Sequence, residues 1–203
     1  MSIVSAELAD RISPALKSFA EKLEGSQRTE ASTAMGEAVQ ALVVAHLREL
    51  AASRHSTAQR LGASPTNYLT EAVNAASDAS VVKADGDGVT LHLRHPVISR
   101  AFRDIHIEAK GAGALTIPIS AMAYGRRASE FDLYSFRSKT TGNSFLALRQ
   151  DDRGAKPLLM YLLVRSVTQQ QDRSLMPSGD EILDAAASGL SRYVRALIGG
   201  LRR

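Results

Sequence analysis

Two acidic residues and a lysine have types and spacing suited to chemistry on a phosphate ester. Glu108-Ala109-Lys110 ends an apolar segment, and Asp87 precedes Glu108 by 21 positions. Two carboxylates can hold Mg²⁺, which prefers oxygen ligands, while a lysine stabilises charge on a phosphate or orients the attacking water. The same residues also fit a plain hairpin, because Asp87 lies between two glycines, where turn formation accounts for it.

An Asp followed by Glu-x-Lys resembles the arrangement in restriction-type nucleases of the PD-(D/E)xK kind. This resemblance implies a magnesium-dependent nuclease that uses Asp87, Glu108 and Lys110. Glu-x-Lys is nevertheless common at exposed strand ends, and a short motif alone is weak support for an activity. The hairpin is therefore the leading interpretation and the nuclease the alternative.

Other candidates for catalysis or ligand binding lack the spacing that such sites need. No histidine lies in an HExxH or similar pattern, no serine lies in a G-x-S-x-G elbow, and Gly111-Ala112-Gly113 lacks the P-loop ending and the Rossmann spacing. The chain has no cysteine, so thiolate chemistry, disulfides and cysteine-ligated zinc are excluded. We predict no metal ion, no cofactor and no enzymatic activity. The histidines considered are His46, His55, His92, His95 and His106.

Basic residues are the main candidates for contacts with other molecules. Residues 1–80 contain 7 Lys/Arg against 9 Asp/Glu, whereas residues 81–203 contain 18 against 12. Such an excess can meet nucleic acid or an acidic protein surface. Aromatic residues make up only 5%, so base-stacking platforms are sparse and protein interfaces are favoured. The candidate residues are Arg126, Arg127, Arg192, Arg195, Arg202 and Arg203.

The composition is that of a globular chain. Hydrophobic residues make up 44% and charged residues 23% of the 203 residues, which is enough to bury a core in one domain or one with an appendage. The longest apolar run, Leu158 to Val164, is too short to span a bilayer, and Met1 to Asp10 lacks the features of an export signal. We therefore expect a chain that is made and used in a reducing cytoplasm, with no membrane partner.

Helical spacing of apolar residues predicts four helices. The first covers Ala6 to Glu24, and after a polar link, Ser26 to Thr29, a long second helix runs from Met35 to about Ser53. Ser64-Pro65 supplies an N-cap followed by proline at the first helical position, so a third helix should begin there. A closing helix covers Asp180 to Ile198, with acidic residues at its start and arginines near its end, as the helix dipole favours.

Alternating apolar residues predict strands in the middle of the chain. Val81 to Leu93 has the pattern of a hairpin around an Asp-Gly turn. Leu158 to Val167 is apolar on both faces and suits a central strand. Three further strands are predicted at Ile105 to Ala109, Leu115 to Ile119 and Phe145 to Leu148.

The order of these elements predicts an α+β fold, with N-terminal helices, a central and mostly antiparallel β-sheet, and a C-terminal helix packed on the sheet. Within the chain we expect an N-terminal helical arm, residues 1–28, and one α+β domain, residues 29–203. Modest cores should leave apolar segments such as Val97-Ile98 and Phe131 to Phe136 for neighbouring subunits to cover.

Two segments have a distinctive order of residues. Lys110 to Ser120 is a lysine-led segment that ends in I-P-I-S and is followed by Ala123 to Arg127, while Pro157 to Val167 ends in L-V-x-S-V. Both resemble segments of phage virion morphogenesis proteins of the tail-completion kind, and the similarity covers about residues 40 to 200. Arg94-His95-Pro96 and the glutamines after Val167 depart from the pattern of that family.

The resemblance implies a structural virion protein, located in the neck or tail of a tailed bacteriophage and assembled in the host cytoplasm. Such a tail-completion, or head–tail connector, component forms a homo-oligomeric ring between the portal or head-completion proteins and the tail tube. The arginines named above would then lie at interfaces or line the lumen, where non-specific contact with passing DNA occurs. A small basic DNA-binding module stays as a further interpretation.

Overall fold

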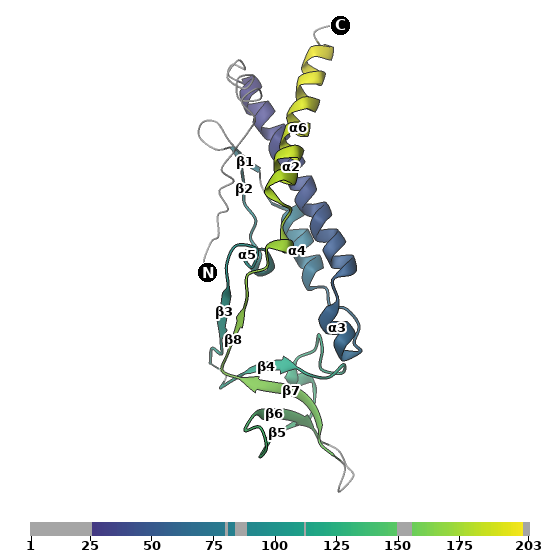
Figure 1. Ribbon diagram of the computed structural model, residues 1–203, viewed down its shortest axis with the longest axis vertical. Helices are drawn as coiled ribbons and strands as arrows, with labels where there is room; N and C mark the ends of the chain where they lie inside the picture. The colour runs from purple at the N-terminus through teal and green to yellow at the C-terminus, as the bar shows by residue number, and fades with distance from the viewer. Residues whose placement is uncertain (1–25, 80, 84–88, 112, 150–155, 201–203) are drawn as a thin grey trace. The chain divides into compact units, whose positions relative to one another are not determined.

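The computed structural model describes residues 26–79, 81–83, 89–111, 113–149 and 156–200 (Figure 1). Its helices are α2 (Ser26–Ser53), α3 (Ser56–Leu61), α4 (Tyr68–Ser77), α5 (Pro96–Ser99) and α6 (Gly179–Gly200), with the 3-10 turns η1 (Ala128–Glu130) and η2 (Arg173–Leu175). Its strands are β1 (Val81–Lys83), β2 (Val89–Leu91), β3 (Ile105–Glu108), β4 (Leu115–Pro118), β5 (Leu133–Arg137), β6 (Ser144–Leu148), β7 (Leu158–Val164) and β8 (Ser166–Gln169). Helices combined with antiparallel sheets confirm the α+β fold class.

The chain forms two compact units, each built from separated stretches of sequence. The unit that we name the helical unit comprises the residues up to Ala51, Tyr68–Arg103 and those from Asp172 onward. The unit that we name the sheet unit comprises Ala52–Asn67 and Asp104–Gln171. The chain therefore passes between the units four times.

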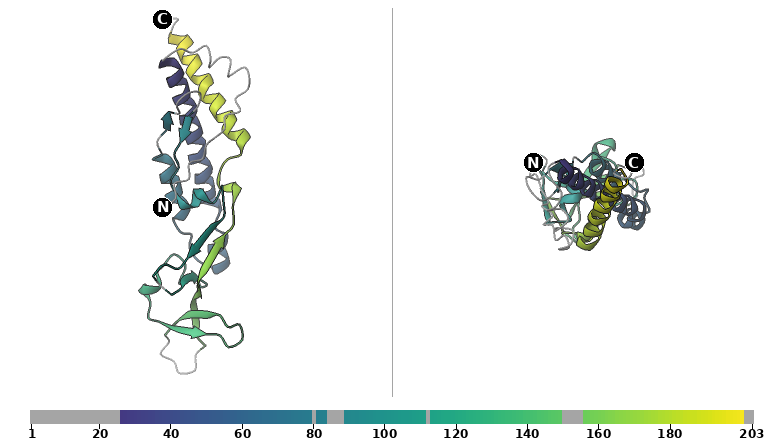
Figure 2. Two further views of the ribbon diagram at one scale, coloured as in Figure 1. Left: turned by 90° about the vertical axis from the view of Figure 1, so that its left-hand side faces the viewer. Right: turned by 90° about the horizontal axis from the view of Figure 1, so that it is seen from above.

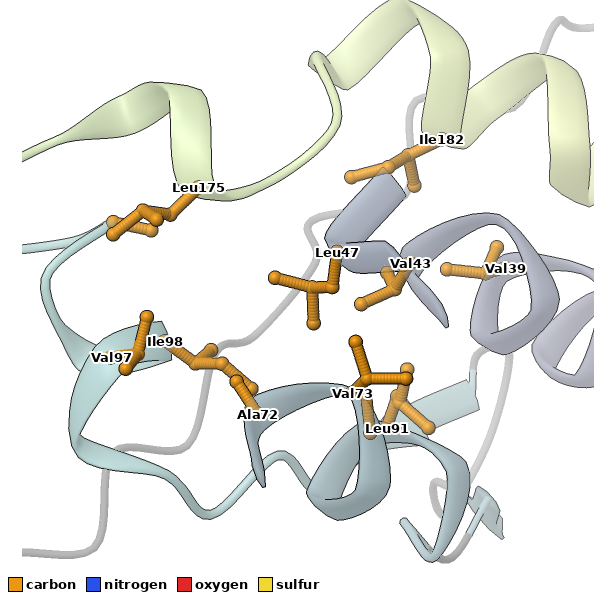
Figure 3. Close-up of a cluster of buried hydrophobic side chains, with 12 residues drawn as sticks. Val39, Val43, Leu47, Ala72, Val73, Leu91, Val97, Ile98, Leu175 and Ile182 are labelled. Atoms are coloured by element: carbon orange, nitrogen blue, oxygen red, sulfur yellow. The ribbon is translucent and has the colours of Figure 1, made fainter. Parts of the chain in front are cut away.

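The helical unit has an aliphatic core to which five elements and one turn contribute (Figure 3). In α2, Val43 and Leu47 are fully buried, and Ile182 of α6 packs against them. Each such side chain contributes on the order of 1.5–3 kcal/mol when it leaves water. The buried members are Val39, Val43, Leu47, Ala72, Val73, Ala76, Leu91, Val97, Ile98, Ala101, Leu175 and Ile182.

The long helices α2 and α6 lie side by side (Figures 1 and 2), and a glycine allows their close approach. Gly189 of α6 is buried, and a Cβ atom there would lie 2.5 Å from the carbonyl oxygen of Ala34 and 2.9 Å from Cβ of Ala38. The next residue, Leu190, packs on Ala31, about one turn before Ala34 in α2, in a second buried cluster. The helix pair therefore depends on small residues on both of its members.

The sheet unit is organised around a four-stranded antiparallel sheet in the order β4-β7-β6-β5. A register shift between Leu146 and Ala147 marks a bulge where β6 meets β7. One face of this sheet carries the buried Met160 and Tyr161, against which the half-buried Leu146 and Phe131 pack. The residues Ser120–Phe131, which follow β4, supply the cover of this face.

A two-stranded ribbon, β3 with β8, completes the sheet unit, and a second short ribbon, β1 with β2, belongs to the helical unit. β7 and β8 are consecutive in the chain but belong to different sheets, with the bend at Arg165 between them. The predicted strand Leu158 to Val167 is thus central, as expected, but it ends at Val164, where the chain changes sheets.

Several predicted helices are confirmed and others need correction. α2 ends at Ser53 as predicted, but it already begins at Ser26, so the expected polar link is helical. The third helix begins at Tyr68 instead of near Pro65, and α3 was not predicted. The first predicted helix, Ala6 to Glu24, lies outside the described residues.

The closing helix is confirmed as α6 (Gly179–Gly200), and within its own unit it packs against α2. Its buried side chains Ile182 and Leu190 lie in clusters with residues of α2, and it belongs to the helical unit, whereas the four-stranded sheet belongs to the sheet unit. These clusters form an α2–α6 helix pair within the helical unit, and packing of α6 on the central sheet stays a prediction. The stripe of apolar residues that predicted the helix does not encode which partner it meets.

Of the two apolar segments that were expected to await neighbouring subunits, Val97-Ile98 is buried within the chain and Phe131 to Phe136 only in part. Val97 and Ile98 are 1% and 2% exposed, because α5 inserts them into the core of the helical unit. The segment Phe131 to Phe136 contains most of β5, a strand that was not predicted, and its apolar side chains are partly buried, whereas Asp132 and Ser135 are exposed. Among the described residues, no helix has the length and apolar character needed to cross a membrane.

Candidate functional site

The two adjacent arginines predicted as contact residues, Arg126 and Arg127, lie in a turn whose backbone is hydrogen-bonded to a side chain of the four-stranded sheet. Tyr161 of β7 is buried, and its hydroxyl donates hydrogen bonds to the carbonyl oxygens of Ala123, at 3.3 Å, and Arg126, at 3.1 Å. Ser120 accepts backbone hydrogen bonds from Ala123 and Tyr124, both at 3.2 Å. We name the segment Ser120–Phe131 the arginine turn. Its backbone is held by Tyr161, a side chain that the sheet positions.

Glu130 closes the arginine turn through reciprocal hydrogen bonds. Its Oε1 accepts from the backbone N–H of Arg127 at 2.7 Å, and its own N–H donates to the carbonyl oxygen of Arg127 at 3.1 Å. Its Oε2 accepts from Nε of Arg126 at 3.0 Å. One carboxylate thus holds both arginines, one by its backbone and the other by its side chain.

The guanidinium of Arg126 also lies over an aromatic ring. Its Cζ is 4.4 Å from the ring centroid of Phe131, a cation–π distance, and the ring of Phe131 lies in turn 6.4 Å from that of Tyr161. The side chain of Arg126 is still 51% exposed. Its charge is therefore oriented by the turn while remaining accessible to a partner.

The surroundings of Glu130 and Tyr161 shift the pKa values of both side chains. The hydrogen bond from the backbone of Arg127, and then that from Arg126, lower the pKa of Glu130 below its ordinary value. Burial, followed by the negative charge of Glu130, raises the pKa of Tyr161. At neutral pH the turn therefore combines an ionised Glu130, a neutral Tyr161 that can donate its proton, and two cationic arginines.

Gly125 is needed in the arginine turn for both conformation and space. Its φ is +76°, a left-handed conformation that side-chain-bearing residues rarely adopt, and a Cβ atom there would lie 3.0 Å from Cγ2 of Thr66. The segment before α4 thus packs close to the turn within the sheet unit. A larger residue at position 125 would displace either Thr66 or the backbone of the arginine turn.

The other candidate arginines belong to a different part of the chain. Arg192 and Arg195 are exposed on α6 in the helical unit, next to Tyr193, whose hydroxyl donates to Oε2 of Glu30 in α2 at 3.1 Å. Arg202 and Arg203 lie outside the described residues. The sequence therefore identified exposed cations in both units, and Arg126 and Arg127 are the pair that the structure brings together.

Two of the three predicted nuclease residues, Glu108 and Lys110, lie in the described part of the chain. Glu108 ends β3 and Lys110 is exposed two residues later, while Asp87 lies outside the described residues. Oε1 of Glu108 lies 3.2 Å from Nε2 of His106, whose Nδ1 lies 3.0 Å from the hydroxyl of Thr168. Glu108 is thus engaged with a histidine on its own strand.

The group Thr168, His106 and Glu108 links a hydroxyl, an imidazole and a carboxylate, as nucleophile–base–acid relays do. Its members lie on one face of the open β3–β8 ribbon, where the side chains of His106 and Glu108 are 52% and 70% exposed. Such relays act where water is excluded and oxyanion donors are preorganised. An exposed pair of this kind contributes about 0–1 kcal/mol and has the character of a surface cross-strand contact.

Two other histidines, His46 and His95, make hydrogen-bonding contacts with the backbone. Nε2 of His46 lies 2.9 Å from the carbonyl oxygen of Ser174, and Nδ1 of His95 accepts a hydrogen bond from the N–H of Val97 at 3.3 Å. Within the part of the chain that the structure describes, no three His, Cys, Asp or Glu side chains gather as a metal site would require.

The residues that sequence reasoning missed are those that hold the arginines. Tyr161 was read as part of an apolar strand, and Glu130 and Phe131 were not connected with Arg126. One signal was available for Glu130, since Arg126 and Glu130 are four residues apart and of opposite charge. No comparable signal connects Tyr161 to a turn 35 residues earlier.

Comparison with known proteins adds no relative: no family model, no curated protein and no solved structure matches the chain.

Proposed function

We propose that the chain is a structural virion protein of a tailed bacteriophage, a neck or tail-completion component that assembles as a homo-oligomeric ring. In this role it would join the portal or head-completion proteins to the tail tube. The proposal starts from the resemblance of Lys110 to Arg127 and Pro157 to Val167 to that family. The observation that carries it further is that these two segments fold together, since β4 pairs with β7 and Tyr161 holds the arginine turn.

The arginine turn has the properties of a contact surface. Its backbone is rigidly bonded, so little conformational entropy is lost when a partner binds, while the charge of Arg126 is exposed. Arg127 is also exposed, and its hydrogen bonds with Glu130 use only its backbone. The turn therefore offers two preorganised cations to an acidic surface.

The charge of the chain is divided unevenly between the units, which suits head-to-tail assembly. The sheet unit contains 11 Lys/Arg against 6 Asp/Glu, and the helical unit contains 14 against 15. A ring requires contacts between two different surfaces of each subunit. Contact between the basic unit of one copy and the other unit of the next would bring unlike surfaces together, and steering by charge favours such encounters.

The test is the mass and location of the protein. Light scattering on the purified chain should give a closed oligomer, and cryo-electron microscopy of phage particles should place it as a ring at the neck or tail. A chain that is monomeric at every concentration and absent from virions would refute the proposal.

A charge reversal tests the role of the arginine turn itself. Arg127→Glu should reduce ring formation severalfold, because it reverses an exposed charge while the backbone bonds to Glu130 persist. Lys139→Glu is the matched control, since it makes the same charge change at an exposed position of the β5–β6 connection. Equal loss of rings in both variants would show that net charge matters and the turn does not.

A further inference from the structure

The strand β5 lies at one edge of the four-stranded sheet and presents unpaired backbone groups there. Arg149 donates its N–H to the carbonyl oxygen of Asp132, and Ser138 donates to that of Asn143, so the even-numbered residues face β6. The N–H and C=O groups of Leu133, Ser135 and Arg137 therefore point outward. Among the described residues, no strand pairs with this side of β5.

The opposite edge of the sheet is protected, which makes the exposure of β5 more informative. In β4, Ile119 donates its N–H to Met160 on β7, so Thr116 and Pro118 point outward. Proline has no N–H to offer and commonly blunts edge strands. β5 contains no proline, and the bulge of this sheet lies between β6 and β7. Of the two edges of this sheet, as far as its residues are described, only that of β5 has neither a proline nor a bulge.

One face of the sheet is apolar and incompletely covered. By the strand register, side chains of all four strands lie on it, and all are half-buried except the buried Ala147. On β5 this face carries Tyr134 and Phe136, and the ring of Phe136 lies 6.5 Å from that of Phe145. We name it the apolar face. It comprises Leu115, Ile117, Tyr134, Phe136, Phe145, Ala147, Leu159, Leu162 and Val164.

We propose that the outer edge of β5 pairs with β5 of a second copy of this chain, antiparallel and about a two-fold axis at Ser135. The outward groups of Leu133 then meet those of Arg137 in the partner, and Ser135 meets its own counterpart. Each of these pairs exchanges two backbone hydrogen bonds. The two sheets become one continuous sheet of twice the number of strands.

The side chains of β5 favour a second copy as the occupant. In this register Tyr134 lies opposite Phe136 of the other copy, in non-hydrogen-bonded positions where cross-strand side chains are closest, so two aromatic pairs form on the apolar face. The charged residue of the strand, Arg137, lies opposite Leu133 and not opposite itself. The pairing therefore creates no contact between like charges.

This inference goes beyond the virion role and does not depend on it. A two-fold contact joins identical surfaces, whereas a ring needs two different ones, so β5 pairing by itself describes a dimer of the free protein. The pairing also covers a strand edge that would otherwise be open to non-specific pairing with strands of other chains. Loss of the ring and loss of the dimer are separate outcomes, because Arg127 and Ser135 are changed in separate variants.

Cross-linking tests the register directly, since the chain has no cysteine. In a dimer of Ser135→Cys, the Cβ atoms of the two introduced cysteines would lie about 4.5–5.5 Å apart. A short bis-maleimide should convert most of the protein to a covalent dimer. Ser56→Cys is the matched control at an exposed position of α3, outside both β5 and the arginine turn, and it should stay monomeric on denaturing gels. Equal cross-linking of the two variants would overturn the register.

Hydrogen exchange and the oligomeric mass from light scattering test the pairing of β5 without cross-linking. As concentration rises, the amides of Leu133, Ser135 and Arg137 should become protected, while those of Tyr134 and Phe136 are protected throughout. Ser135→Pro removes the central donor on the solvent side of the strand and should weaken dimerisation at least tenfold by light scattering, whereas Ser135→Ala should not. A monomeric mass at all concentrations, or odd-numbered amides that exchange equally at all of them, refutes the pairing.

Discussion

Tyr161 connects the sheet to the arginine turn through one hydroxyl group, and that group can be removed alone. Tyr161→Phe keeps the ring but leaves the carbonyl oxygens of Ala123 and Arg126 without this donor. Ala123 is fully buried, so the loss should cost about 1–2 kcal/mol of unfolding free energy, measured by urea denaturation.

The matched control for this change is Tyr134→Phe, because Tyr134 is only half-buried on the other face of the sheet. It should change the unfolding free energy by less than about 0.5 kcal/mol. If the two variants were equally stable, the hydroxyl of Tyr161 would not hold the turn.

His95 should make the helical unit sensitive to acid. Its Nδ1 caps α5 by accepting from Val97, and burial lowers the pKa of His95 below 6.5, with Glu71 opposing in part. Between that lowered pKa and 6.5 the unfolded chain binds more protons than the folded one, so stability rises with pH there. As pH falls from 7 through this window, the unfolding midpoint in urea should decrease.

Asparagine offers a cap that does not titrate in this range. His95→Asn should therefore flatten the pH dependence between pH 7 and 5 while keeping most of the stability at pH 7. Tyr68, whose ring lies 5.9 Å from that of His95, and Arg100, which acts on Tyr68 electrostatically, remain in place in this variant. An unchanged acid dependence would assign it to another group.

At the scale of residues, the sequence predicts which side chains are exposed and charged but not what holds them. Arg126 and Arg127 stand out as a basic pair, and both are at the surface. The carboxylate of Glu130 and the hydroxyl of Tyr161 that organise them were not predicted. Only the fold brings Tyr161 to the turn, and no periodic pattern in a single strand encodes that contact.

At the scale of elements, Gly189 and Gly199 of α6 form a natural pair for comparison. Alanine normally stabilises an exposed helix position by up to about 1 kcal/mol relative to glycine. At Gly189 the added methyl group would meet the backbone of Ala34 at 2.5 Å, so Gly189→Ala should destabilise the chain by about 1–3 kcal/mol through overpacking.

At Gly199 a Cβ atom would have no neighbour within 4 Å. Gly199→Ala should therefore leave the thermal midpoint unchanged or raise it slightly. Opposite signs for the two variants are expected in a calorimetric scan. A stabilising Gly189→Ala would mean that α2 and α6 do not approach as described.

The elements that the sequence predicted best are those with long periodic patterns. α6 and the end of α2 lie where apolar spacing placed them. β5 was missed because its alternation covers only a few residues and its pairing with β6 supplies the rest. The packing of α6 on α2 was not predicted for a similar reason, since an apolar stripe fits a helix as well as a sheet.

At the scale of the whole molecule, the division into two units predicts two responses to local damage. Gly189→Ala should lower protection from hydrogen exchange in α2 and α6, and Tyr161→Phe should lower it in β4–β7, with little effect on the other unit. Uniform loss of protection in both variants would show that the units unfold together. The predicted boundary between residues 1–28 and 29–203 stays a prediction.

The positive charge of the sheet unit predicts weak, salt-dependent contact with duplex DNA. Affinity should fall steeply between 50 and 200 mM salt, and Arg127→Glu should reduce the slope of log affinity against log salt by about one or more. Addition of magnesium should produce no cleavage. Cutting that requires magnesium and is lost in Glu108→Ala would instead support the nuclease.

The passage of the chain between the units also sets an order of events during synthesis. α2 is synthesised before all the described strands of the sheet unit, and its partner α6 is synthesised after them. The sheet unit can form from hairpins close in sequence while α2 still exposes its apolar side. A chain released after residue 178 should therefore hold a formed sheet and an unpaired α2, which makes the synthesis of α6 the step that completes the helical unit.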